Sequence, residues 1–177
     1  VGYQLTKMLT QEGAIVTVSD TKTSTTEKLK KEFSTHTVSV DDIYDADCDV
    51  FAPCALGGTV NLDTVHRIKA SIIAGSANNQ LSHKRVADIL LQKGVLYAPD
   101  FVINAGGLIN AALVYDYQDP QMADKKINQL YDTLLTIFEK SAQRQLNTLE
   151  IAKEIAIRRL KTAKKNNLKN EHQHLNT

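Results

Sequence analysis

The sequence predicts an α/β protein in which a doubly wound parallel sheet is followed by a group of C-terminal helices. Two observations predict this fold. Up to residue 98, short apolar segments of strand length alternate with segments of helix length, the pattern of parallel strands joined by helical crossovers. After Pro99 one helical segment follows another, and no further strand is predicted.

The first elements follow from the spacing of apolar residues. Leu5, Met8 and Leu9 recur at helical spacing, and Gly13 follows them as a stop signal. The next run is β-branched and nearly continuously apolar, which is typical of a strand covered on both faces. The elements predicted in this region are a helix at 3–11, a strand at 14–19, a helix at about 24–33 and a short strand near 38–40.

The middle of the chain repeats a strand, loop and helix unit. Each apolar run ends in a loop of small or polar residues, and a helical pattern follows. Ser82 is expected to cap one of these helices and Gly94 to end it. The predicted elements are a strand at 48–53, a helix through 65–68, a strand at 70–74, a helix from 82 to about 92 and a strand at 95–98.

The C-terminal part is predicted to be entirely helical, with helices at about 101–117, 121–145 and 147–166. One face of the last helix carries an apolar stripe, formed by Leu149, Ala152, Ile155, Ala156 and Leu160. We therefore divide the chain into a sheet domain at 1–118, C-terminal helices at 119–167 and a polar, frayed tail at 168–177.

The composition is that of an ordinary globular protein. The 21 basic and 20 acidic residues nearly balance, so the charge indicates no nucleic-acid partner. No apolar run is long enough for a membrane span and no signal peptide is present, which favours a cytoplasmic protein. Cys48 and Cys54 are expected to be reduced thiols, and no metal site is predicted.

A ligand is expected at the carboxyl ends of the strands, where loops meet helix N-termini. Asp20 ends the first apolar run and lies 18 residues beyond Gly2, close to the spacing between the glycine turn and the ribose acid of dinucleotide sites. Its carboxylate would bind both ribose hydroxyls and repel a 2′-phosphate, which favours NAD over NADP. The alternative is a solvated aspartate that caps the next helix through residues 21–23.

The chain opens on Val1 and on the last glycine of this fingerprint only, so we expect it to be a fragment that lacks a first strand and two glycines. Two other segments carry candidate ligand groups. The amides of Asn78-Asn79 and Asn104-Ala-Gly-Gly107 could orient a carboxamide or an amino acid. Both segments are also common in plain turns, and this alternative stays open.

Three segments, at 48–57, 74–81 and 97–107, resemble the family of glutamate, leucine, phenylalanine and valine dehydrogenases. The resemblance covers the chain from Val1 to about residue 165 and is to the C-terminal, NAD-binding domain of that family. It implies a Rossmann-type fold and an oxidoreductase. The implied reaction is the NAD-dependent oxidative deamination of a branched-chain, leucine-like L-amino acid to its 2-oxo acid and ammonia.

The resemblance also implies roles for individual residues. Those expected to bind the cofactor are Val1, Gly2, Asp20, Thr21, Cys54, Ala55, Ala77, Asn78 and Asn104. Asn79, Leu108 and Ala111 are expected to meet the substrate, the last two as walls of the side-chain pocket. For Leu108 and Ala111 the alternative is ordinary helix core.

In this family the lysine and aspartate that transfer protons lie in an N-terminal domain without a counterpart here. Lys7, Lys22 and Lys84 are interpreted as solvated, so we predict no catalytic residue in this chain and no turnover by the chain alone. The apolar stripe of the last helix is expected to face the absent catalytic domain. The full-length protein is expected to form a homo-oligomer.

Several alternatives remain at this point. Within the family, a phenylalanine or valine dehydrogenase is the nearest one, whereas glutamate is disfavoured because Leu108 and Ala111 offer no positive partner for a carboxylate. Outside it, a non-catalytic NAD-binding module would be a complete chain with its own glycine turn. A methyltransferase would not need the two asparagine segments, and cofactor titration would distinguish it.

Overall fold

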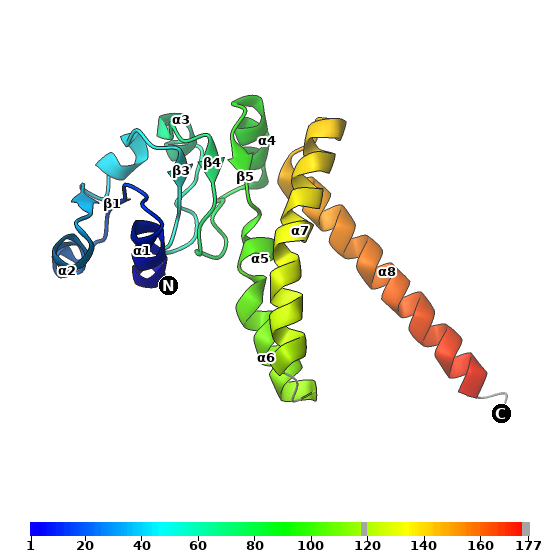
Figure 1. Ribbon diagram of the computed structural model, residues 1–177. Coiled ribbons are helices and arrows are strands. Elements are labelled where there is room, and N and C mark those ends of the chain that lie inside the picture. The colour runs from blue at the N-terminus through cyan, green and yellow to red at the C-terminus, as the bar shows by residue number, and fades with distance from the viewer. Residues whose placement is uncertain (118–119, 175–177) are drawn as a thin grey trace.

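The computed structural model describes residues 1–117 and 120–174 and confirms an α/β protein with parallel sheets and a predominance of helix. Its strands form two groups (Figure 1). One sheet pairs β1 (Thr17–Val18) with β2 (His36–Thr37), and the other has the order β3 (Val50–Phe51), β4 (Ile72–Ile73) and β5 (Leu96–Tyr97). All these pairs are parallel.

Helices connect the parallel strands within each sheet, as parallel pairing requires. The helix α1 (Gly2–Gln11) precedes β1, and α2 (Thr23–Phe33) joins β1 to β2. The 3-10 helix η1 (Asp42–Asp45) leads into β3, while α3 (Thr64–Arg67) and α4 (Lys84–Gln92) are the crossovers of the three-stranded sheet.

The main core lies between the three-stranded sheet and its two crossover helices. Ile73 of β4 and Leu90 of α4 are almost completely buried there. The other buried members of this cluster are Val60, Val65, Ile68, Ala70, Val86 and Tyr97. The largest buried cluster of the sheet domain therefore packs on β3, β4 and β5. This packing holds the loops at the carboxyl ends of these strands in place.

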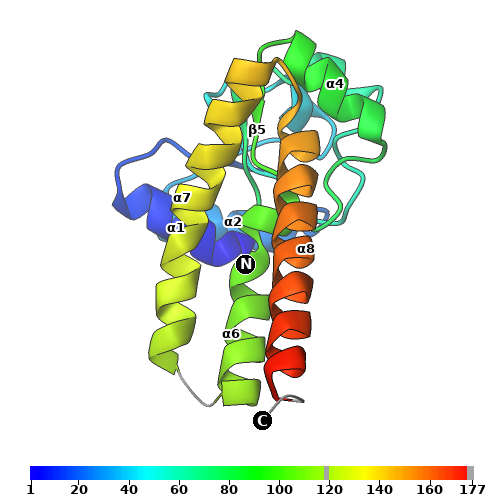
Figure 2. The same cartoon turned by 90° about the vertical axis from the view of Figure 1, so that its right-hand side faces the viewer.

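The C-terminal helices extend from this sheet as a separate group. They are α5 (Asp100–Ile103), α6 (Ala105–Tyr117), α7 (Pro120–Arg144) and α8 (Thr148–His174). Helices α6 and α7 run side by side, and α8 leaves the corner at the end of α7 and diverges from it (Figures 1 and 2). A second core cluster, made by Val102, Ile137, Ile151 and Ala152, holds α5, α7 and α8 together.

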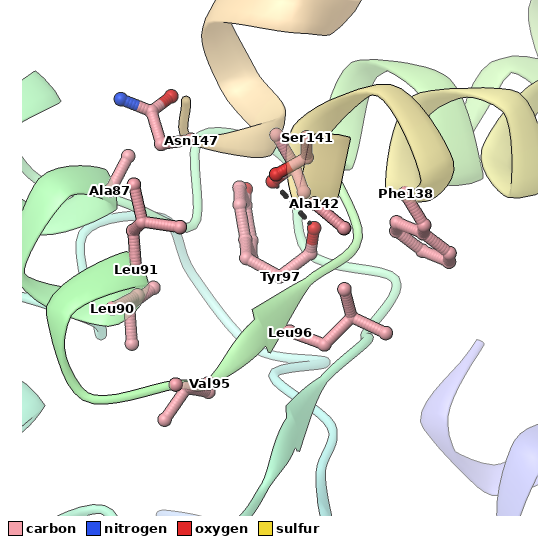
Figure 3. Close-up of a pocket in the computed structure, with 12 residues that line it drawn as sticks. Ala87, Leu90, Leu91, Val95, Leu96, Tyr97, Phe138, Ser141, Ala142 and Asn147 are labelled. Atoms are coloured by element: carbon pink, nitrogen blue, oxygen red, sulfur yellow. Dashed lines mark hydrogen bonds between the residues drawn. The ribbon is translucent and has the colours of Figure 1, made fainter. Parts of the chain in front are cut away.

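The corner between α7 and α8 is tied to the sheet domain by two hydrogen bonds. Thr148 Oγ1 donates to the carbonyl oxygen of Tyr97 at 2.7 Å, and Asn147 Nδ2 donates to Asp88 Oδ1 at 2.6 Å. Gln145, with φ of 54°, makes the left-handed turn that ends α7. Beside these bonds lies a cavity of about 160 Å³, which Figure 3 shows between Leu90, Tyr97 and Phe138.

The predicted elements are present, with differences at their ends. The strand expected near 38–40 lies at His36–Thr37, because pairing with Thr17 and Val18 sets its register. His83, not Ser82, caps α4, since its Nδ1 accepts a hydrogen bond from the backbone N–H of Arg85 at 3.1 Å. The helix expected at 101–117 is broken at Asn104.

The C-terminal segment also differs from the expectation of a frayed tail at 168–177. Helix α8 continues to His174, and residues 175–177 lie outside the described part of the chain. Its apolar stripe is divided: Ala152 is buried in the second core, whereas Leu160 is 71% exposed. Over the described residues, no helix is long and apolar enough to cross a membrane.

Candidate functional site

Two loops interlock at the carboxyl ends of β3 and β4. Gly75, just after β4, packs directly against the loop after β3. A Cβ atom built on Gly75 would lie 2.2 Å from the carbonyl oxygen of Pro53. The same oxygen accepts a hydrogen bond from the backbone N–H of Ala77 at 2.8 Å. Glycine is therefore required at position 75 by the close approach of two backbones.

A second glycine extends this contact. A Cβ atom on Gly57 would lie 2.7 Å from the carbonyl oxygen of Asn78 and 2.8 Å from that of Asn79. The backbone N–H of Gly58 donates to the Asn79 carbonyl at 2.8 Å, and Asn79 itself is left-handed with φ of 52°. The loops at 53–60 and 75–82 thus form one continuous surface.

Asn104 joins this surface from the break between α5 and α6. Its Nδ2 donates to the carbonyl oxygen of Ala77 at 3.0 Å and to Asn78 Oδ1 at 3.3 Å. Three residues predicted to bind the cofactor, which come from two segments of the sequence, therefore lie in direct contact. The hydrogen bonds show that the two segments meet, and their role in cofactor binding stays a prediction.

The N-terminus of α1 lies at the same loop. A Cβ atom on Gly2 would lie 3.3 Å from Cβ of Cys54, so these two predicted cofactor residues are also neighbours. Val1, before the helix, is 87% exposed, and Ala55 is exposed as well. An exposed helix N-terminus that presents free N–H groups suits a phosphate group.

Asp20 lies two residues beyond the end of β1 and is exposed, as is Thr21. Its Oδ1 accepts a hydrogen bond from the backbone N–H of Lys22 at 2.8 Å, just before α2 begins. This contact is a local turn and not a helix cap, since no side chain caps the N-terminus of α2. The bond occupies Oδ1 of Asp20. The exposed carboxylate can still accept hydrogen bonds from a ribose.

Leu108 and Ala111 lie one turn apart on α6, and both are exposed, Leu108 to 75%. The helix-core alternative is therefore wrong for these two residues in the described structure. Tyr115 on the same helix is 88% exposed. Helix α6 is apolar on nearly all sides but packs along α7 on one side, so it presents an apolar wall to solvent.

The sequence interpretation missed two polar residues that organise the site, Gln80 and Asp100. Gln80 is completely buried, and its backbone N–H donates to Asp100 Oδ2 at 3.0 Å. The backbone N–H of Asp100 in turn donates to the Tyr97 hydroxyl at 3.3 Å. Burial and the nearby Asp100 raise the pKa of Tyr97, which keeps its hydroxyl neutral. The signal that identifies this network is structural: Gln80 is buried, whereas the two asparagines before it are exposed.

The described residues offer little acid–base chemistry at this edge. Lys7, Lys22 and Lys84 are all exposed, as expected for solvated lysines. No group of three or more His, Cys, Asp or Glu side chains within 1–117 and 120–174 could hold a metal ion. The polar groups at this edge are suited to binding and orienting a ligand.

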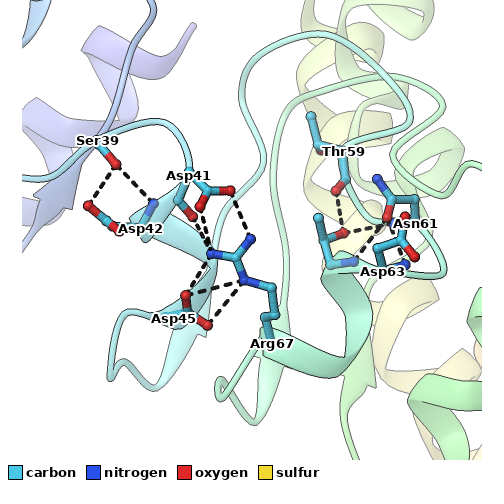
Figure 4. Close-up of polar contacts among 9 residues, drawn as sticks. Ser39, Asp41, Asp42, Asp45, Thr59, Asn61, Asp63 and Arg67 are labelled. Carbon is cyan, nitrogen blue, oxygen red and sulfur yellow. Dashed lines mark hydrogen bonds and ion pairs between the residues drawn. The ribbon is translucent and has the colours of Figure 1, made fainter.

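A charged cluster lies at the opposite edge, where the strands begin (Figure 4). Arg67 bridges Asp41 and Asp45 of the η1 region, with nitrogen–oxygen distances of 2.8 and 2.6 Å. Hydrogen bonding to the guanidinium lowers the pKa of both carboxyl groups. The cluster connects η1 to the end of α3. Both elements precede a strand, whereas the loops that carry the site follow the strands.

Residues 2–167 match the family described as Glutamate/Leucine/Phenylalanine/Valine dehydrogenase. Leucine dehydrogenase from Bacillus cereus is 42% identical, over 97% of this chain and 48% of that protein. Phenylalanine dehydrogenase from Caldalkalibacillus thermarum is 39% identical, over 90% of this chain and 45% of that protein. The crystal structure of L-tryptophan dehydrogenase from Nostoc punctiforme superposes with a TM-score of 0.85 and 41% identity, over 92% of this chain and 49% of that one. The chain thus spans less than half the length of these relatives.

Proposed function

Because this chain belongs to the glutamate/leucine/phenylalanine/valine dehydrogenase family, we propose that it is the NAD-binding, C-terminal half of an amino-acid dehydrogenase. The proposed reaction is the oxidative deamination of a branched-chain L-amino acid to its 2-oxo acid and ammonia. The contact of Asn104 with Ala77 and Asn78 carries the proposal, because it gathers the predicted nicotinamide residues at one sheet edge.

The arrangement of the strands supports a Rossmann-type fold. Both sheets are parallel, and β1 and β3 each have a known neighbour on one side only. One further parallel strand between β1 and β3 would join them into a single sheet with helices on its crossovers. We propose that this strand, together with the first two glycines of the fingerprint, belongs to sequence before Val1.

The residues present fit a dinucleotide in two respects. Gly2 at the start of α1 lies against Cys54, and the exposed N-terminus of this helix would hold the pyrophosphate, beside Val1 and Ala55. Asp20 and Thr21 at the end of β1 would hold the adenosine ribose, and the Asp20 carboxylate favours NAD over NADP.

The nicotinamide end would lie along the interlocked loops. Asn78 and Asn104 would orient the carboxamide, with Ala77 against the ring, and Asn79 would reach the substrate. NAD, when bound, accepts a hydride from the α-carbon of the amino acid. The contribution of this chain is to hold the ring and the substrate at a fixed distance and orientation. The protons would be moved by groups outside this chain.

The exposed apolar face of α6 supports an aliphatic substrate. Leu108 and Ala111 would form one wall of the side-chain pocket and offer no charge to a side-chain carboxylate. Differences of one or two methylene groups in such a wall change discrimination by only about 1 to 3 kcal/mol. A phenylalanine or valine preference is therefore the alternative within the family, and the relatives themselves differ in substrate.

The test is a steady-state assay of the full-length protein with NAD and leucine, valine, phenylalanine or glutamate. We expect NADH formation with leucine to exceed that with glutamate by at least about 100-fold in kcat/KM, or about 2.7 kcal/mol. The purified chain 1–177 should bind NADH weakly and form none from leucine. Rapid turnover by that chain, or NAD binding by the full-length protein without any amino-acid oxidation, would contradict the proposal.

A homo-oligomer is part of the same proposal. Besides the proposed pocket wall, Tyr115 of α6 and Leu160 of α8 are exposed apolar residues that need a cover in the whole protein. We assign the stripe of α8 to the catalytic half of the enzyme. Light scattering of the full-length protein should give a mass of at least two chains.

A further inference from the structure

Gln80 lies fully buried beneath the loop that carries Asn78. Its side chain bends back along its own chain, and Nε2 donates to the carbonyl oxygens of Gly75 at 2.7 Å and Ala77 at 3.0 Å. Because carbonyl oxygens can only accept, the amide nitrogen must be the atom that faces them. A single side chain thus closes the loop at 75–79 from below.

The backbone of Gln80 is held equally well. Its N–H donates to Asp100 Oδ2 at 3.0 Å, and its carbonyl accepts from the backbone N–H of Val60 at 3.1 Å. The residue therefore links the loop after β4 to both the loop after β3 and the start of α5. A side chain anchored in this way has little freedom to move with the loop.

The most consequential contact is the one to Ala77. Its carbonyl oxygen receives both Gln80 Nε2 and Asn104 Nδ2, each at 3.0 Å, so both lone pairs are used. This fixes the plane of the peptide between Ala77 and Asn78. In a trans peptide the N–H points opposite to the carbonyl, so the N–H of Asn78 is directed away from buried Gln80.

We propose that Gln80 is a positioning residue for the nicotinamide end of the cofactor. It sets the peptide plane at Ala77–Asn78, and thereby the N–H and side chain of Asn78 that would meet the carboxamide. The inference rests on the proposed function. It adds a residue that touches neither cofactor nor substrate and acts only through Ala77 and Asn78.

The discriminating variant is Gln80→Met in the full-length protein, which keeps the length of the side chain and removes its donors. Dissociation constants would be measured by calorimetry for two ligands, NADH and ADP-ribose. ADP-ribose contains the Asp20 end of the cofactor without the nicotinamide. We expect NADH to bind at least about tenfold more weakly, and ADP-ribose to change by less than about twofold.

Thr148→Val is the matched control, because it also removes a buried hydrogen bond to a backbone carbonyl, that of Tyr97, in the corner of the C-terminal helices. It should lower the melting temperature without changing the ratio of the two dissociation constants. If Gln80→Met weakens both ligands equally, or neither, Gln80 has only a structural role and the inference is wrong. If the unaltered protein binds neither ligand, the proposed function itself fails.

A second variant covers the case in which Gln80→Met does not fold. Gln80→Glu has the same shape, and its neutral form still offers one donor to the carbonyls. Burial raises a carboxyl pKa, so ionisation should set in well above its usual range and repel the two carbonyl oxygens. Between about pH 6 and about pH 9, the NADH affinity of this variant should fall. We expect this fall to be about tenfold larger than the fall in the unaltered protein over the same range. A pH profile parallel to that of the unaltered protein would overturn the inference.

Discussion

Gly75→Ala is the substitution that tests most directly whether the two loops of the site interlock. The added Cβ would lie 2.2 Å from the carbonyl oxygen of Pro53 and 2.4 Å from its nitrogen. Relaxed contacts of carbon are near 3.5 Å, so the two backbones must separate by about 1.3 Å. That movement also stretches the 2.8 Å hydrogen bond from Ala77 N–H to the same Pro53 oxygen.

The expected cost has two parts. Overpacking against backbone costs about 1 to 3 kcal/mol, and loss of the hydrogen bond adds about 1 kcal/mol. A total of about 3 kcal/mol corresponds to a fall of about 6 to 12 °C in melting temperature for a domain of this size. Since φ at Gly75 is not positive, backbone strain adds nothing to these two parts.

Gly107→Ala is the control for this experiment. No atom lies within 4 Å of a Cβ at this helical position, so the substitution should stabilise α6 by about 0.5 to 1 kcal/mol. Urea unfolding of the two variants and the unaltered chain measures both changes in the free energy of unfolding, the expected loss and the expected gain. A Gly75→Ala variant within about 0.5 kcal/mol of the unaltered chain would refute the close approach of the loops.

Three further predictions follow from other contacts. Asp20→Ser should improve NADP binding relative to NAD by at least about tenfold in the full-length protein, measured as a ratio of dissociation constants, because it removes the carboxylate that repels a 2′-phosphate. Arg67→Gln should lower stability at neutral pH. Since Arg67 lowers the pKa of both aspartates that it bridges, this loss of stability should shrink as the pH falls below their ordinary pKa of 3.8, which urea midpoints at neutral and acidic pH would show. Thr148→Val should cost about 1 to 2 kcal/mol in urea unfolding through loss of its buried hydrogen bond to Tyr97.

The sequence was sufficient for the order and type of most strands and crossover helices, because these strands lie in short apolar runs and the crossovers have helical spacing. It did not predict η1 or the break between α5 and α6. It placed the second strand a few residues late, since Val38 and Val40 have high strand propensity whereas the register is set by pairing of His36 and Thr37 with β1. Propensity is a property of the residue, and register depends on the partner strand.

For the site, the motifs identified Asn78 and Asn104 as candidates, but nothing in their spacing shows that they bond to each other. The same holds for Gly57 and Gly75, whose necessity comes from backbones about 20 residues away along the chain. Gln80 was missed because a glutamine in a polar loop is normally exposed, and only the folded chain buries it. Contacts between distant segments account for each of these omissions.

The corner between α7 and α8 fixes the direction in which α8 leaves the sheet domain. Two hydrogen bonds, from Asn147 and Thr148, hold this corner on the sheet domain. Helix α8 has 27 residues and extends about 40 Å from the corner. A rotation of α8 by about 10° at the corner would move its far end by about 7 Å. A change of a few degrees in how the corner lies on β5 would therefore displace the far end of α8 by a few ångströms.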